Sequence, residues 1–136
     1  MRSLERSICI LLAVLGGLCA SLVLWGSLTP TVVLHYAQDA AAPVVVYFND
    51  NHRLTRETIH PGESVRFSTT MFASPESWIE VSTPFVNRGG VEITGKFSRV
   101  DVCISAQARF SAHTRHQYFA RFTSPIESCK DSDHER

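Results

Sequence analysis

Several features that would point to a particular chemistry are missing from this 136-residue chain. Lys plus Arg and Asp plus Glu are equal at 13 each, so no excess of positive charge argues for binding to nucleic acid. The chain has no G-x-S-x-G, no H-E-x-x-H and no glycine-rich phosphate loop. Ser, His and Asp all occur, but no spacing between them indicates a catalytic triad. We therefore predict that the protein is not an enzyme and needs no cofactor.

A long uncharged run dominates the first part of the chain. Ser7 to Leu28 read SICILLAVLGGLCASLVLWGSL, without a charge or a proline. At about 1.5 Å per residue, a helix of this length spans the roughly 30 Å hydrocarbon core of a bilayer, whereas the apolar region of a signal peptide has only about 7–15 residues. We predict a retained signal anchor. The alternative is a cleaved leader and a secreted soluble domain.

The basic residues near this run predict its orientation. Arg2 and Arg6 precede it, and no Lys or Arg follows until Arg53. Since basic residues favour the cytoplasmic side, the N-terminus is predicted in the cytoplasm and the rest outside, in the periplasm if the membrane is a bacterial inner membrane. Trp25 and Tyr36 then fall near the outer interface. The predicted organisation is a cytoplasmic stub at 1–6, a single-pass transmembrane helix at 7–28, a tether at 29–42, an exported domain at 43–129 and a polar tail at 130–136.

Small residues lie on one face of the predicted helix. Ala13, Gly17 and Ser21 are four positions apart, a spacing that lets two helices approach closely and predicts a homodimer through this face. The alternative is that small residues are simply common in membrane helices. Cys9 and Cys19 are expected to be inert packing residues of the helix.

Short runs rich in β-branched and aromatic residues follow from Pro43 onward. Alternating apolar and polar positions, as in GVEIT, are typical of half-buried strands. His60 to Glu63 read HPGE, which suits a type II turn. Six to eight short strands predict an all-β antiparallel sandwich. IHPGESVRF resembles a strand–turn–strand corner of immunoglobulin-like and cupredoxin-like domains, which implies one of these two types. The predicted strands cover residues 43–48, 64–70, 77–82, 90–94, 98–105 and 116–122.

Two cysteines lie in the predicted exported domain. Cys103 and Cys129 are 26 positions apart, and an even pair in an oxidising compartment usually forms a disulfide. Alternation places Cys103 opposite Val102 and Ile104, on the outer face of its strand. The sequence therefore predicts a Cys103–Cys129 bridge that ties the C-terminal segment to the sheet.

Histidines give a metal-binding alternative. His113 and His116 form an H-x2-H spacing at a predicted hairpin tip, and two imidazoles three positions apart can approach one copper or zinc ion, with His60 as a third ligand. The other interpretation is that they are exposed turn residues.

Aromatic residues are interspersed among basic ones between Gly95 and Thr123, where Asp101 is the only acidic residue. Such a surface could bind an anionic partner, such as a phospholipid head group or an acidic protein face. The other interpretation is a normal sandwich strand with arginines in water. The basic residues concerned are Lys96, Arg99, Arg109, Arg115 and Arg121.

These features together predict a small single-pass membrane protein. It would display a non-catalytic interaction or accessory domain outside the membrane, and its expected partners are the lipid bilayer and another membrane or periplasmic protein. The alternatives are a periplasmic metal-binding domain and the secreted domain described above.

Overall fold

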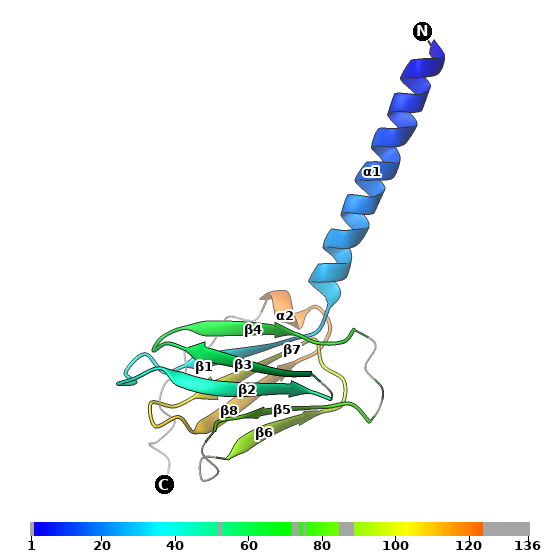
Figure 1. Cartoon of the computed structure of the whole chain (residues 1–136). Helices are drawn as coiled ribbons and strands as arrows, with labels where there is room; N and C mark the ends of the chain where they lie inside the picture. Colours follow the sequence, from blue (N-terminus) through cyan, green and yellow to red (C-terminus); the bar gives the residue numbers. More distant parts are fainter. Residues whose placement is uncertain (1, 52, 72–73, 75, 85–88, 124–136) are drawn as a thin grey trace.

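A long apolar helix leads into a β-rich domain (Figure 1). The computed structural model describes residues 2–51, 53–71, 74, 76–84 and 89–123. Helix α1 (Arg2–Leu28) carries an apolar stretch from Glu5 to Leu28 that is not buried inside the structure. By its length and composition, α1 could cross a membrane.

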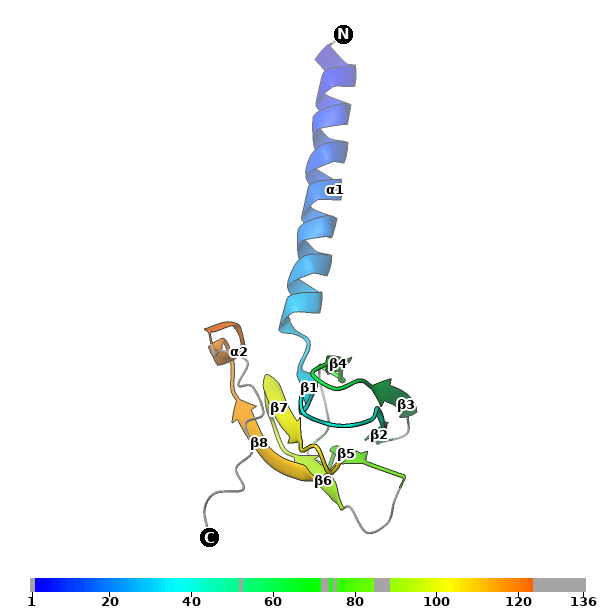
Figure 2. The same ribbon diagram turned by 90° about the vertical axis from the view of Figure 1, so that its left-hand side faces the viewer.

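Two four-stranded sheets pack face to face (Figure 2). All neighbouring strands are antiparallel except β1 and β7, which run parallel. The predicted all-β class is confirmed, whereas the choice between the two sandwich types stays a prediction. The first sheet, here the β1 sheet, has the order β4 (Ser64–Ser68), β1 (Thr31–Tyr36), β7 (Arg99–Ile104) and β8 (Phe110–His116). The second, the β2 sheet, has the order β3 (Arg53–Ile59), β2 (Val44–Asp50), β5 (Trp78–Ser82) and β6 (Gly90–Thr94).

Alternating side chains from both sheets form the core. On β2, Val44, Val46 and Phe48 are buried while the residues between them are half-exposed. Phe48 stacks on Phe67 of β4 with ring centroids 4.3 Å apart, which joins the two sheets. Each fully buried Val or Leu contributes about 1.5–3 kcal/mol, so this shared core is the main force that holds the sheets together.

Strand β1 lies within the range 29–42 that the sequence predicted to be a tether. All six of its residues are buried, because β4 and β7 flank it and both of its faces are covered. Tyr36, expected near a membrane interface, is a core residue that is 6% exposed, and its hydroxyl donates to the Ala42 carbonyl at 2.9 Å. Only Thr29 and Pro30 separate α1 from β1, so the tether prediction is replaced by a direct junction.

The predicted turn after β3 is present. Gly62 has φ +76°, and the Glu63 amide donates to the His60 carbonyl at 2.9 Å, as a type II turn requires. Later in the chain the boundaries differ from the prediction. His113 and His116 belong to strand β8 rather than to a hairpin tip. The prediction of a strand at 116–122 is wrong: β8 ends at His116, Tyr118 adopts φ +48°, and the short helix α2 (Ala120–Thr123) follows. Strand β3, which the sequence did not predict, is mostly exposed.

Candidate functional site

Asp101 is the centre of a polar network on the outer face of the β1 sheet. Its Oδ1 lies 2.8 Å from His35 Nε2, and its Oδ2 lies 2.6 Å from Arg99 Nε and 2.9 Å from His116 Nε2. His35 Nδ1 is 2.7 Å from the Ser64 hydroxyl. These five residues come from β1, β4, β7 and β8, so the network joins all four strands of the sheet.

Strand register explains why these side chains meet. His35 is opposite Ser64 on β4, and Arg99 is opposite His116 on β8. Arg99 and Asp101 are two positions apart on β7 and therefore point to the same face. His35 is opposite Cys103 on β7, which makes Asp101 its diagonal neighbour.

Burial and hydrogen bonding determine the charge of Asp101. Asp101 is 7% exposed, and this burial raises its pKa. The hydrogen bonds from His35 and Arg99, with the positive charge of Arg99, lower the pKa by more, and the net shift is downward from 3.8. Because the carboxylate can only accept, His35 Nε2 must donate to it, and in the neutral imidazole Nδ1 then accepts from the Ser64 hydroxyl.

Ser64, His35 and Asp101 thus form a hydroxyl–imidazole–carboxylate chain that the sequence alone did not reveal. This order of groups is what nucleophilic catalysis by serine uses. Here Asp101 Oδ2 also contacts Arg99 and His116. The one signal in the sequence is the opposite charge of Arg99 and Asp101 on one face of a strand. The other partners, His35 on β1 and Ser64 on β4, are 66 and 37 positions away from Asp101 in the sequence.

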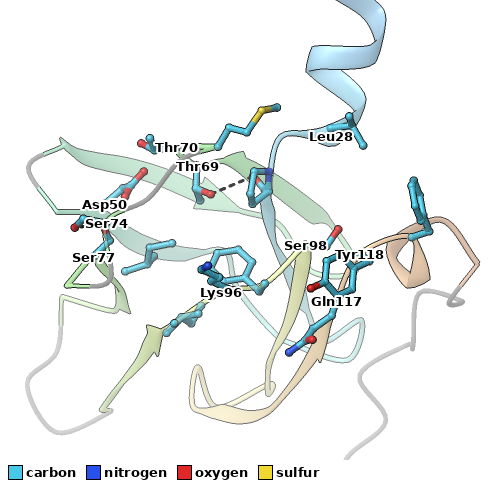
Figure 3. A pocket seen from close by; sticks show the side chains of 17 residues that line it. Leu28, Asp50, Thr69, Thr70, Ser74, Ser77, Lys96, Ser98, Gln117 and Tyr118 are labelled. Atoms are coloured by element: carbon cyan, nitrogen blue, oxygen red, sulfur yellow. Dashed lines mark hydrogen bonds between the residues drawn. The ribbon is translucent and has the colours of Figure 1, made fainter.

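A pocket of about 510 Å³ lies at one end of the sandwich, beside the end of α1 (Figure 3). It is located where β1, β5 and β7 begin and β2, β4, β6 and β8 end. Asp50, Ser74 and Ser77 lie on the side opposite Gln117 and Tyr118. Its lining is mostly apolar, with Ile79 and Ile93 buried between the sheets. Sequence reasoning did not identify this pocket, because its lining comes from loops far apart in the chain.

The three histidines of the metal hypothesis are not brought together as a metal site. His113 and His116 are three positions apart on β8, so they point to opposite faces of the sheet. His116 contacts Asp101, and His60 is exposed in the turn before β4. In the described part of the chain, no three His, Cys, Asp or Glu side chains are grouped as a metal site would require.

The five basic residues do not form one exposed surface. Arg99 is 5% exposed and pairs with Asp101, because the outer face of β7 is covered rather than open to water. Lys96, Arg109 and Arg115 are exposed, and the Arg115 guanidinium lies near Gly95. Arg121 belongs to α2.

The remaining predicted residues are only partly described. Cys103 is half-buried in β7 opposite Ala112, while Cys129 and the tail at 130–136 lie outside the described residues, so the disulfide stays a prediction. Ala13, Gly17 and Ser21 are exposed on α1, where the Ser21 hydroxyl donates to the Gly17 carbonyl at 2.9 Å. Dimerisation through them also stays a prediction.

In comparisons with protein-family models, curated proteins and solved structures, none matches this chain at a significant level.

Proposed function

We propose that this protein is a single-pass membrane protein that displays a non-catalytic β-sandwich as an interaction or accessory module close to the membrane surface. The N-terminus lies in the cytoplasm and the sandwich outside, which is the periplasm in a bacterial cell. The partner is another membrane or periplasmic protein.

The observation that carries this proposal is the exposed apolar surface of α1. Its large side chains from Ile8 to Leu28 are 45–69% exposed. In water this surface would be costly, at about 25 cal/mol per Å² of apolar area, whereas a bilayer would cover it. Hydrogen bonds within the helix also satisfy the backbone N–H and C=O groups, which lipid could not do.

The junction between α1 and the sandwich supports a position near the membrane. Thr29 and Pro30 are the only residues between the helix and β1, and two extended residues reach only about 7 Å. Because β1 is a central strand of its sheet, this short link holds the whole domain close to the end of the helix.

The polar network supports a non-catalytic function. Asp101 is held by three side chains at once, His35, Arg99 and His116. The pocket adjoins the end of β4 at Thr69, whereas Ser64 lies at the start of that strand, about 13–17 Å away at the usual rise per residue. A substrate in this pocket would therefore not reach Ser64.

Membrane extraction and fusion reporters test the anchor and its orientation. We expect the full chain to stay in the membrane pellet after alkaline carbonate and to be extracted only by detergent. Alkaline phosphatase, which is active only outside the cytoplasm, should be active when fused after Thr123. Release by carbonate would overturn the anchor, and an inactive fusion at full expression would overturn the orientation.

Site-specific photo-crosslinking tests the interaction module. Leu54 on β3 is 64% exposed, so a photoreactive residue at this position should capture a neighbouring protein in intact membranes. A photoreactive residue at Val46, which is buried, is the matched control and should capture none. Absence of adducts at Leu54, and also at the exposed Arg56, Thr58, Glu80 and Glu92 of the same sheet, would contradict a protein partner on this face.

A further inference from the structure

The pocket at the end of the sandwich is continuous with the end of the anchor. Leu28, the last residue of α1, forms part of its lining, together with Met71 and Phe97. Ile79 and Ile93 close it toward the core. Its volume of about 510 Å³ lies within the roughly 300–1,000 Å³ typical of sites for small apolar ligands.

Exposed aromatic side chains stand next to this pocket. Tyr118 is 82% exposed and Phe119 71%, and both contribute to the lining. Phe122 of α2 is 57% exposed and stacks on Phe119 with centroids 6.5 Å apart. Three large aromatic residues in one surface cluster are unfavourable in water, but their amphipathic rings suit the interface of a membrane.

The position of the cluster relates it to the bilayer. In both views α2 lies on the side of the sandwich from which α1 leaves (Figures 1 and 2). Since two residues link α1 to β1, the cluster stays near the end of the helix. Lys96, exposed at the pocket, supplies a positive charge that complements a lipid phosphate.

We propose that this pocket binds an acyl chain of a phospholipid from the bilayer that holds α1, with Tyr118, Phe119 and Phe122 immersed in the interface. This inference rests on the proposed anchor, because only a bilayer at the end of α1 would bring lipid to the pocket. The anchored module would thereby be fixed in orientation rather than free to tumble on its short link.

Photoactivatable lipid tests this proposal on the full chain. The protein is reconstituted in phosphatidylcholine–phosphatidylglycerol vesicles that contain phosphatidylcholine with a diazirine in its acyl chain, and adducts are mapped by mass spectrometry. We expect adducts along α1, and further adducts at Gly95–Ser98 and Gln117–Phe119.

Two matched tryptophan substitutions distinguish the pocket from the general surface. Thr70 is exposed and lines the pocket, so Thr70→Trp fills part of it, whereas Thr58→Trp places the same side chain on β3 away from it. Because exclusion of only two methylene groups weakens binding by about tenfold, the pocket adducts should fall at least that much in Thr70→Trp and stay unchanged in Thr58→Trp. Phe119→Ser, at an exposed position, should also reduce them and provides a second variant if Thr70→Trp does not fold.

Adducts along α1 serve as the internal reference. If they form without pocket adducts, or if the pocket adducts persist in both Thr70→Trp and Phe119→Ser, the lipid proposal is wrong while the anchor stands. If α1 itself acquires no adduct, the proposed anchor fails, and the lipid proposal fails with it.

Discussion

The Asp101 side chain connects three strands of the β1 sheet, because it contacts His35 on β1, Arg99 on its own strand β7 and His116 on β8. It is buried and has three side-chain partners, and one of them, Arg99, is a cation with a side chain that is 6% exposed. Sequence spacing alone could not identify the Arg99–Asp101 pair, since alternation shows only that these two residues share a face. Whether that face is buried or exposed to solvent depends on the rest of the fold.

Loss of the Asp101 charge should destabilise the protein strongly. In Asp101→Asn, Arg99 remains buried without its carboxylate, and breaking a buried pair from one side costs about 3–5 kcal/mol. Thermal or urea unfolding of the full chain in detergent measures this cost. Glu92→Gln, which neutralises an exposed carboxylate on β6, is the matched control and should change stability by less than about 0.5 kcal/mol. Equal effects of the two substitutions would contradict the structural role of the network.

Acid should remove the stabilisation that the charge of Asp101 gives to the folded chain. The pKa of Asp101 is lower in the folded chain than its ordinary value of 3.8, so the unfolded chain takes up the proton first as the pH falls. The stabilisation is therefore complete above pH 3.8 and is lost as the pH falls through the folded pKa. The difference in melting temperature between wild type and Asp101→Asn should shrink below pH 3.8. A constant difference across this range would show that the charge of Asp101 does not carry the effect.

At the scale of elements, alternation of apolar and polar residues predicts some strands correctly and misses others, including β1 and β3. GVEIT and RVDVCI alternate, and β6 and β7 lie where they were predicted. TVVLHY is covered on both faces between β4 and β7, so its apolar residues form a nearly continuous run that resembles an extension of the helix. Strand β3 was not predicted for the opposite reason: RLTRETI is largely exposed and lacks an apolar face.

Helix α1 gives a prediction at the same scale. If Ala13, Gly17 and Ser21 form a dimer face, Gly17→Leu should separate the two helices and weaken dimerisation by about tenfold or more. Gly26 is nine positions later and so points to the opposite side of the helix, which makes Gly26→Leu the matched control. An added side chain meets no other atom of the chain at either glycine. Energy transfer between labelled chains in vesicles measures the association, and equal dimerisation of wild type and both variants would contradict this face.

At the scale of the whole molecule, the division into an apolar helix and a β-domain could be predicted from the long uncharged run and the local alternation of residues. The pocket could not, because its lining converges from loops at the ends of seven strands. Strand order, including the parallel pairing of β1 with β7, determines which loops meet there. These long-range pairings leave no local pattern in the sequence.

The predicted Cys103–Cys129 bridge can be tested by intact-mass measurement of the full chain. Cys9 and Cys19 are free thiols on α1, and Cys103 lies on the outer face of β7 beside the Asp101 network. A bridge that closes such a loop stabilises a small domain by about 3–4 kcal/mol. The full chain, purified from membranes and denatured, should therefore alkylate at two of its four cysteines without reductant and at all four with it.

The variant Cys103→Ser provides the control, since it should release Cys129 and give three reactive thiols without reductant. Four reactive thiols in the unreduced wild type would contradict the bridge. The same spectrum tests the anchor: a full-length mass requires that α1 is retained, whereas a mass that lacks α1 would support a cleaved leader and a secreted domain. Retention of α1 together with an intact bridge would mean that the sandwich is covalently closed on the side where disulfides persist, which is the outer side that Arg2 and Arg6 predict.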